Sequence, residues 1–311
     1  MPWNRRMPGE AEIVRPACRD DVPALGDLFE EVFGARRDPA IWIWKYFDNP
    51  RGCMSFVCEA AGRLVAHCAG TPVVFRDRGR DTLALQVSDI MSSPRHTGGA
   101  GRGGVFYRTM KGFFDAYCGP NAIPVVYGFP GERHRLVGER LLGYSAVEPV
   151  CEFHLDAGTA SRRPEPLALR DLDFFGRLPL RTGAVRDLTY LRWRYADHPV
   201  ARYGKVAVRR RLLPGTQIAA LVREDDRMLQ VMEVAGRFSR TAVEDLAAAL
   251  AAAGKEVLLW GSPEHPVGRA LAEGGFSVRE RDHWLEVRRF DGGPAPAAGE
   301  LYYSLGDYDV Y

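Results

Sequence analysis

The sequence has 311 residues, of which 46% are hydrophobic and 26% charged, and its formal net charge is +2. This composition is that of an ordinary folded protein with room for two domains. The small net charge gives no reason to expect nucleic acid or another polyanion as a partner.

Other features of the sequence narrow the class of protein further. No run of about 18 apolar residues occurs, so we expect no membrane partner. No apolar segment follows the basic start Met1–Met7, so we expect no secretory signal. The six cysteines form no Cys-x-x-Cys pair. Their spacing predicts reduced core residues, a cytoplasmic location and no metal site. High contents of alanine, arginine and glycine are typical of a bacterial protein from a GC-rich genome.

The first half of the chain alternates strands and helices. Asp20 is the expected N-cap of the first helix, Ala61-Gly62 the turn of a hairpin, and Gly143 the end of the last helix. The periodicity predicts strands at 12–17, 54–60, 63–75, 82–91, 122–128 and 144–155, and helices at 20–33, 39–47, 105–117 and 130–142.

A glycine-rich basic segment joins the strand at 82–91 to the helix at 105–117. Its sequence is Arg95-His-Thr-Gly98-Gly-Ala-Gly101-Arg-Gly-Gly104. Glycines leave backbone N–H groups free of Cβ obstruction, and the following helix points its positive end at them. We therefore predict a phosphate or pyrophosphate site here. A glycine-rich connector without a ligand is the structural alternative.

The second half of the chain repeats the first, after a segment at 156–187 with the composition of a linker. Four matches occur in the same order: Trp44-Lys-Tyr-Phe-Asp-Asn-Pro50 with Trp193-Arg-Tyr-Ala-Asp-His-Pro199, Val87-Ser-Asp-Ile-Met91 with Val231-Met-Glu-Val-Ala235, Val126-Tyr-Gly-Phe-Pro130 with Leu259-Trp-Gly-Ser-Pro263, and Gly143-Tyr-Ser145 with Gly275-Phe-Ser277. The second half lacks the glycine-rich segment. It is therefore expected to shape a pocket rather than to bind the phosphate, and residues 291–311 to fold back onto the body.

The order of these elements resembles the GNAT N-acetyltransferase superfamily, as does the motif Arg95-His-Thr-Gly98-Gly-Ala100. Leu141-Leu-Gly-Tyr144 also resembles the Leu-Gly-Phe that closes a helix in that family. The resemblance covers residues 12–155 and suggests a tandem arrangement. It implies an α+β fold (an α/β mixed sheet) with one domain at 1–155 and a degenerate copy at 188–290. Each domain would be a twisted, mixed, mostly antiparallel sheet flanked by helices.

The resemblance also implies the chemistry. An acyl group would pass from acyl-coenzyme A, acetyl-coenzyme A in the simplest case, to a small-molecule or peptide amine by direct attack, with no metal. Coenzyme A would contact His134 and a continuous set of strand and loop residues: Ile90, Met91, Ser92, Arg95, His96, Gly98, Gly99, Ala100, Gly101, Arg102, Gly103 and Gly104. The family's tyrosine acid is expected near Gly138 or Glu139, and neither is a tyrosine.

Three residues are candidates for acid–base catalysis. Asp89 would be the base, directly or through water, and Glu233 lies at the equivalent place of the repeat. Tyr127 would be the acid in place of the absent tyrosine. Each has a structural alternative: an aspartate bonded to its neighbours, a solvated strand-end carboxylate, and a packed aromatic ring.

Aromatic residues on the helix at 39–47 border the acceptor site in the resembling fold. Trp44 recurs as Trp193, which favours a core role for it. Trp42 and Tyr46 are then the candidates for a substrate wall. For His134, a surface position on its helix is the structural alternative.

Two other classes of function stay open at this point. A non-catalytic acyl-coenzyme A-binding or scaffold protein is favoured by the absent tyrosine and the degenerate second half. An aminoacyl transferase that uses charged tRNA is the other, and the near-neutral charge and the glycine-rich segment argue against it. The sequence determines neither the acceptor amine, nor the acyl chain, nor the oligomeric state, a homodimer included.

Overall fold

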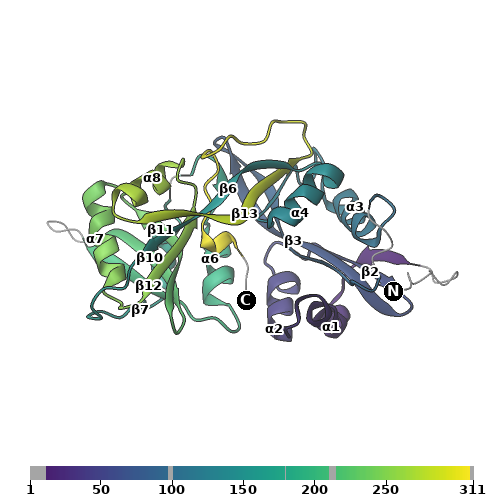
Figure 1. Ribbon diagram of the computed structural model, residues 1–311, viewed down its shortest axis with the longest axis horizontal. Coiled ribbons are helices and arrows are strands. Elements are labelled where there is room, and N and C mark those ends of the chain that lie inside the picture. The colour runs from purple at the N-terminus through teal and green to yellow at the C-terminus, as the bar shows by residue number, and fades with distance from the viewer. Residues whose placement is uncertain (1–11, 97–100, 179, 210–214, 309–311) are drawn as a thin grey trace. The chain divides into compact units, whose positions relative to one another are not determined.

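The computed structural model describes residues 12–96, 101–178, 180–209 and 215–308 (Figure 1). The chain forms two compact units. Unit 1 contains Met1–Thr71 and Val87–Ala122, and unit 2 contains Pro72–Gln86 and Ile123–Tyr311. Two strands, β3 (Arg63–Asp77) and β4 (Arg80–Ser92), run from one unit into the other.

Unit 1 is a small sheet with helices on both faces. Besides its parts of β3 and β4, it contains β1 (Ile13–Pro16), η1 (Arg19–Asp21), α1 (Val22–Phe33), α2 (Pro39–Trp42), the π-helical turn η2 (Ile43–Phe47), β2 (Ser55–Ala60) and α3 (Val105–Tyr117). Strand β2 pairs antiparallel with both β1 and β3. Figure 1 shows α1 and α2 on one side of these strands and α3 on the other.

Side-chain alternation along β2 produces the two faces of unit 1. Val57 packs with α1 and α2 in a cluster that includes Trp42 and Met91. Its neighbour Cys58 packs against α3 at Val105. Each face of the strand therefore buries one apolar layer.

The start of α1 differs by one residue from the expectation. Asp21, rather than Asp20, immediately precedes the helix. The Asp21 carboxylate accepts the Cys18 N–H (2.8 Å) and pairs with Arg15 (2.8 Å), which fixes the preceding turn. The hairpin turn predicted at Ala61-Gly62 and the helix end predicted at Gly143 are confirmed. These three residues have left-handed backbone angles (φ +51°, +71° and +71°).

Unit 2 carries the longer part of the sheet. Its elements are β5 (Val125–Gly128), α4 (Glu132–Val137), the π-helical turn η3 (Gly138–Leu142), β6 (Ser145–Leu155), β7 (Glu165–Pro166), α5 (Leu169–Phe175), β8 (Gly183–Ala184), α6 (Leu188–Leu191), the π-helical turn η4 (Arg192–Ala196), β9 (Gly204–Arg209), β10 (Thr216–Glu224), β11 (Met228–Gly236), α7 (Arg240–Ala251), β12 (Glu256–Gly261), α8 (Pro266–Glu273), β13 (Ser277–Arg289) and η5 (Leu305–Asp307). Figure 1 shows α7 and α8 against this sheet, and their apolar residues pack on β10–β12.

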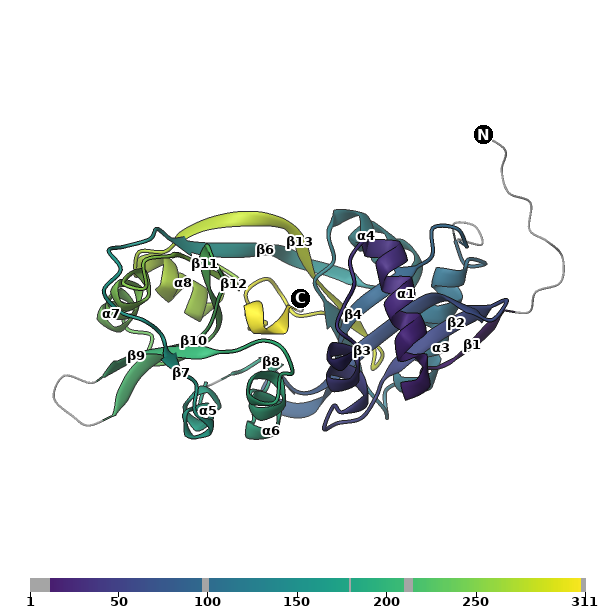
Figure 2. The ribbon, with the colours of Figure 1, turned by 90° about the horizontal axis from the view of Figure 1, so that it is seen from below.

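The strand order in unit 2 is not the sequence order. It runs β4-β5-β13-β6-β12-β11-β10-β9-β7. Strand β13, from the second half of the sequence, lies between β5 and β6, and β6 pairs with β12. Figure 2 shows β6 and β13 as two long strands side by side. Because the halves exchange these strands, the units are not divided at the expected boundary near residue 155.

The fold class expected from the sequence is confirmed. The described sheet is mixed and mostly antiparallel, helices flank it, and β4–β5 and β11–β12 pair in parallel. The expected linker at 156–187 contains three short elements, β7, α5 and β8. Leu301, Tyr302 and Tyr303 of the C-terminal segment are buried.

The repeat seen in the sequence has a local structural counterpart. In each half a short α-helix continues directly into a π-helical turn: α2 into η2, and α6 into η4. An aspartate caps each one, with Asp38 accepting the Ala40 N–H (2.8 Å) and Asp187 the Tyr190 N–H (2.8 Å).

Candidate active site

The parallel pairing of β4 with β5 is short. In unit 2 it joins Ala84 to Val125, Leu85 to Val126 and Gln86 to Tyr127. Strand β4 continues to Ser92, whereas β5 ends at Gly128. Within the described residues, the backbone groups of β4 beyond Gln86 are therefore not used by β5.

Asp89 bends this last part of β4. Its backbone has φ +50°, a left-handed conformation that aspartate tolerates better than most residues. The buried His67 ring stabilises the bend, since its Nδ1 lies 2.7 Å from the Asp89 carbonyl oxygen and its Nε2 2.9 Å from Ser55 Oγ. Beyond the bend, Met91 is buried in the core, while Ile90 and Ser92 are half-buried.

The glycine-rich segment leads from β4 to α3 in unit 1. Gly98, Gly99 and Ala100 lie outside the described residues. Gly101 has φ +115°, a conformation that favours glycine. Gly104 is the N-cap of the 13-residue helix α3, where no side chain caps the helix and no acidic residue lies in the first turn. The positive end of α3 therefore carries no anionic group of its own.

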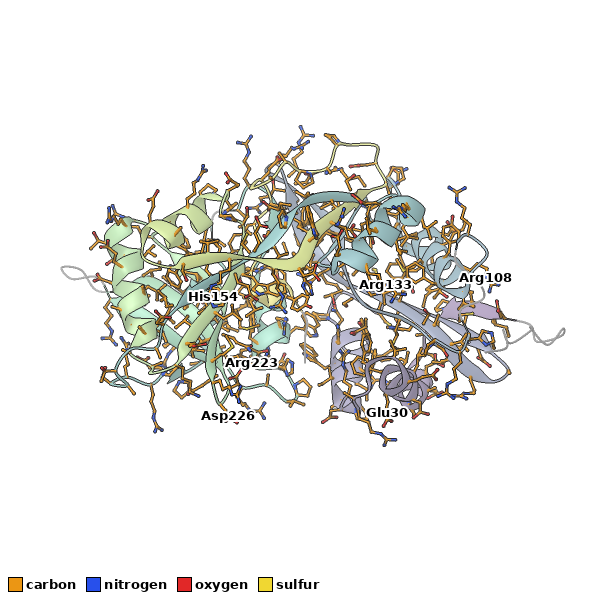
Figure 3. The ribbon with its side chains drawn as sticks, in the orientation of Figure 1. Glu30, Arg108, Arg133, His154, Arg223 and Asp226 are labelled. Atoms are coloured by element: carbon orange, nitrogen blue, oxygen red, sulfur yellow. The ribbon has the colours of Figure 1, made fainter. Side chains whose placement is uncertain are left out.

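The basic residues of this segment differ in their surroundings. Arg95 lies 3.4 Å from Glu31, and His96 lies 3.5 Å from Glu12. Arg108, on the first turn of α3 and labelled in Figure 3, also pairs with Glu12. Arg102 is exposed and adds positive charge beside the start of α3.

Asp89 is the centre of a buried polar group in unit 1, which we name the Asp89 cluster: Arg37, Lys45, Tyr46 and Asp89. Its Oδ2 accepts from Arg37 Nη1 (2.7 Å), Lys45 Nζ (2.7 Å) and the Tyr46 hydroxyl (2.6 Å). Burial alone would raise the pKa of this carboxyl, but the Lys45 and Arg37 charges outweigh burial and hold the pKa well below its usual range. Three donors on one oxygen thus keep the Asp89 carboxylate ionised, which does not favour the role of base.

Glu233 occupies the equivalent group in unit 2, the Glu233 cluster: Arg186, Tyr195, Glu233, Ser304 and Asp307. Its Oε1 accepts from Arg186 Nε (2.8 Å) and from the Tyr195 hydroxyl (2.8 Å). Its Oε2 accepts from Ser304 Oγ (3.1 Å), and Arg186 also pairs with Asp307. These groups are buried, so Glu233 anchors the C-terminal segment.

Three positions correspond between the two clusters. Arg186 and Tyr195 stand at the repeat positions of Arg37 and Tyr46, and Glu233 at that of Asp89. In both, an arginine just before the helical segment and a tyrosine within it bond one strand carboxylate. The second half lacks a glycine-rich segment but keeps this arrangement. The arrangement therefore holds the helical segment on its strand whether or not a phosphate site is present.

Tyr127 is buried on β5. Its hydroxyl and Asp307 Oδ1 have no hydrogen-bond partner in the described part of the chain. Burial, followed by the negative charge of Asp307, raises the pKa of Tyr127 well above its usual value. A phenol so weakly acidic is a poor proton donor.

The other predicted side chains lie in two environments. Trp42 and Tyr46 are buried in the core beneath α1, so neither forms a surface in this structure. His134 is exposed on α4, and its backbone N–H donates to the Gly131 carbonyl (3.0 Å). The roles assigned to these residues stay predictions.

A cleft in unit 2 corresponds to the end of the β4–β5 pairing. Strands β11 and β12 pair in parallel from Met228 to Gln230 and then separate. A pocket there is lined by Val231–Val234 of β11, by Leu259–Ser262 at the end of β12, and by Tyr302–Ser304 of the C-terminal segment. The cavity that is left measures about 20 Å³, room for one water molecule.

Glu286 on β13 was not singled out from the sequence. It is 3% exposed, and its Oε1 has no partner among the described residues. In the antiparallel pairing of β13 with β5, it lies opposite Gly128, the last residue of β5. In the sequence it is a charged residue between the apolar Leu285 and Val287. The alternation of a half-buried strand would place such a residue in solvent.

Metal and membrane sites were also sought in the described ranges. No group of three or more histidine, cysteine, aspartate or glutamate side chains gathers there as a metal site would require. None of the described helices combines the length and apolar character needed to span a bilayer.

Comparison with known proteins agrees with this geometry. Residues 13–137 match the family model of the acetyltransferase (GNAT) domain. No curated protein sequence matches the chain significantly.

Solved structures share the fold at low identity. A GCN5-related N-acetyltransferase from Kribbella flavida is 15% identical, with a TM-score of 0.64 over 91% of this chain and 72% of that one. Another, from Anabaena variabilis, is 14% identical, with a TM-score of 0.65 over 90% and 73%. The N-myristoyltransferase of Saccharomyces cerevisiae with bound myristoyl-CoA is 12% identical, with a TM-score of 0.59 over 92% and 80%. The chain therefore shares the fold of these N-acetyltransferases, and its residues 13–137 are similar to the acetyltransferase (GNAT) domain.

Proposed function

We propose that the chain is an acyl-coenzyme A-dependent N-acyltransferase, with an acetyl group as the simplest acyl group and a small-molecule or peptide amine as acceptor. The observation that carries the proposal is the end of the β4–β5 pairing at Gln86 and Tyr127, with β4 continuing toward an uncapped helix. The family match of residues 13–137 supports the same reading.

The donor's phosphates would bind at the start of α3. The backbone N–H groups around Gly103 and Gly104 and the positive end of the helix suit a pyrophosphate. Arg102 is exposed there and can pair with a phosphate oxygen.

The thioester would lie along β4 beyond Gln86. Backbone groups that no neighbouring strand uses can polarise its carbonyl oxygen, which favours attack by a neutral amine. The reaction forms an N–C bond, breaks the C–S bond and moves one proton from nitrogen to sulfur. In the repeat, the corresponding space between β11 and β12 is filled by Tyr302–Ser304, so one donor per chain is expected.

Release of free thiol tests the activity. The protein is incubated with acetyl-coenzyme A or longer acyl-coenzyme A and a panel of amines, and the free thiol is measured with a thiol reagent. Acceptor-dependent thiol release is the expected result. Coenzyme A binding without release over the whole panel would indicate a non-catalytic binding protein, and retention of charged tRNA would indicate an aminoacyl transferase.

A charge change at Gly103 tests the phosphate site. A Cβ at Gly103 meets nothing within 4 Å, so Gly103→Asp places a carboxylate near the start of α3 without a steric conflict. We expect coenzyme A affinity to fall by a factor of about 10 or more, about 1.4 kcal/mol. Gly103→Ala is the matched control and should bind normally. Equal thermal stabilisation of both variants by coenzyme A would show that the phosphates bind elsewhere.

A further inference from the structure

A larger pocket lies within unit 2, on the side of its short helical segments. Helix α5 packs against α6 and η4, and Figure 2 shows α5 and α6 side by side. The pocket measures about 490 Å³, a volume within the range of small-molecule sites. Its lining residues come from the segments 167–172 and 192–203, and all of them belong to unit 2.

The buried part of this pocket is apolar. Leu172, Tyr195 and Tyr203 are buried, and the two tyrosine rings meet edge to face with their centroids 5.0 Å apart. The Tyr195 hydroxyl donates to Glu233 (2.8 Å), and the Tyr203 hydroxyl lies 3.5 Å from Arg194 Nη1. Because both hydroxyls are engaged, the tyrosines offer a ligand their rings. Such a surface suits an aromatic group, which packs against rings and buries apolar area.

The exposed part of the pocket is charged. Arg192 Nε lies 3.5 Å from Asp197 Oδ2, and both side chains are more than half exposed, so this pair is weak. Arg202 Nη1 donates to the carbonyl oxygens of His198 (3.3 Å) and Ala201 (3.2 Å). These bonds hold the guanidinium group at the pocket. Its Nε and Nη2 bond none of the residues that the structure describes, so they are available to a ligand.

His198 adds no charge to the lining. Its Nδ1 accepts the backbone N–H groups of Val200 (3.2 Å) and Ala201 (2.9 Å). A ring nitrogen that accepts hydrogen bonds carries no proton, so this imidazole is neutral. The charged residues of the lining are then two arginines and one aspartate, which leaves the pocket with a net positive charge of one.

We propose that this pocket binds a small organic monocarboxylate with an aromatic ring. The ring lies against Tyr195 and Tyr203, and the carboxylate pairs with Arg202, with Arg192 close by. Guanidinium groups bind carboxylates through paired N–H donors. A single carboxylate balances the charge of the lining, whereas a phosphate dianion exceeds it. The site goes beyond the proposed function, because it lies within unit 2 and needs no acyl-coenzyme A.

Calorimetric titration of the full-length protein with 3-phenylpropionate tests the site, in the absence of acyl-coenzyme A. Two matched ligands separate the contributions of charge and ring. The amide 3-phenylpropionamide has nearly the same shape without the charge, and propionate has the charge without the ring. We expect saturable binding of 3-phenylpropionate in the millimolar range or tighter. Each matched ligand should bind more weakly by a factor of about 10.

Substitutions in the lining should change this affinity in opposite directions. Arg202→Gln should weaken the binding of 3-phenylpropionate by a factor of about 10, because it removes a charge-assisted hydrogen bond. Asp197→Asn should strengthen the binding by a factor of about 3, because it removes the negative charge of the lining.

Two further variants guard against effects on the fold. Arg202 also bonds backbone carbonyls, so its loss can loosen the segment after η4. Arg192→Gln breaks only the weak pair with Asp197 and should weaken binding by a factor of about 3 without changing the thermal midpoint. Arg269→Gln is the matched control. Arg269 is exposed on α8, outside the lining, and its substitution should leave the affinity unchanged.

Several results would overturn the site. One is the absence of saturation by 3-phenylpropionate up to about 10 mM. Another is an affinity that is equal in Arg192→Gln, Arg202→Gln and the unsubstituted protein, or that falls as much in Arg269→Gln, because the ligand then binds elsewhere. Binding of inorganic phosphate as tightly as 3-phenylpropionate would show a site for any anion and would contradict the assignment to a carboxylate.

Discussion

At the scale of single residues, Asp89 and Glu233 were predicted as catalytic carboxylates, and the structure gives each of them structural bonds. Both lie on strands, and both bond an arginine just before a helical segment and a tyrosine within it. Their correspondence across the repeat supports a structural role for each.

Removing the Asp89 charge tests this view. In Asp89→Asn the buried Arg37 and Lys45 lose their carboxylate, so the free energy of unfolding should fall by about 3–5 kcal/mol in urea titrations. Asp115→Asn is the control. It breaks the exposed Lys111–Asp115 pair and should cost about 0.5 kcal/mol or less. An Asp89→Asn protein of normal stability and lowered kcat would show instead that Asp89 is catalytic.

The Asp89 pKa also sets a pH dependence of stability. The folded-state pKa is held below that of the unfolded chain, about 3.9. The stabilisation is therefore fully present above about pH 4 and is lost as the pH falls below that value. The free energy of unfolding of the unsubstituted protein should decline there more steeply than that of Asp89→Asn. Parallel curves for the two proteins would contradict the prediction.

At the scale of elements, the C-terminal segment acts as a permanent occupant of the second cleft. Tyr302–Ser304 lie between β11 and β12, and η5 packs on the Glu233 cluster. The segment supplies the groups that a ligand would otherwise bring to this cleft. The second half therefore contributes stability to unit 2 rather than a second donor site.

A single methyl group in η5 should loosen this segment. A Cβ on Gly306 would overlap the Tyr195 hydroxyl and the Glu233 carboxylate. We expect Gly306→Ala to lower the free energy of unfolding by about 1–3 kcal/mol and to speed proteolysis within 292–299. Gly26→Ala in α1, where a Cβ meets nothing within 4 Å, is the control and should be neutral or slightly stabilising. Unchanged proteolysis of Gly306→Ala would show that η5 does not depend on this contact.

Local elements were predictable from the sequence because local patterns determine them. The spacing of Val22, Leu25, Leu28 and Phe29 predicts α1, and those side chains are buried. Gly143 ends its helix with the left-handed backbone that glycine allows. The matched segments around Trp44 and Trp193 predicted a repeat, and both have the same α-to-π helical form.

The features of the fold that could not be predicted from the sequence depend on long-range strand pairing. Nothing in the order of elements indicates that β13 lies between β5 and β6, because strand register across more than a hundred residues leaves no local pattern. Glu286 was missed for that reason: alone it looks like a solvent-facing residue, and only β5 and η3 make it buried. The placement of Trp42 and Tyr46 in the core depends likewise on which face of the helix meets β2 and β4.

At the scale of the whole molecule, strand exchange joins the two halves of the sequence in one sheet of unit 2. Strand β13 pairs with β5 and β6 of the first half, and β6 pairs with β12 of the second. Each half thus supplies a strand that completes the pairing of the other. A chain cut at the apparent sequence boundary would leave unpaired strand edges in both pieces, and such edges are prone to aggregation.

This arrangement predicts the behaviour of the separated halves. Expressed alone, residues 1–155 should lack a cooperative unfolding transition, because β5 and β6 lose β13, and β6 also loses β12. Residues 156–311 should fail in the same way without β6. Co-expression of the two pieces should give a complex that co-elutes in gel filtration and unfolds cooperatively by circular dichroism, and it serves as the control for the cut itself. A cooperative transition in residues 1–155 alone would show that the first half is an independent domain and that the exchanged strands are dispensable for its fold.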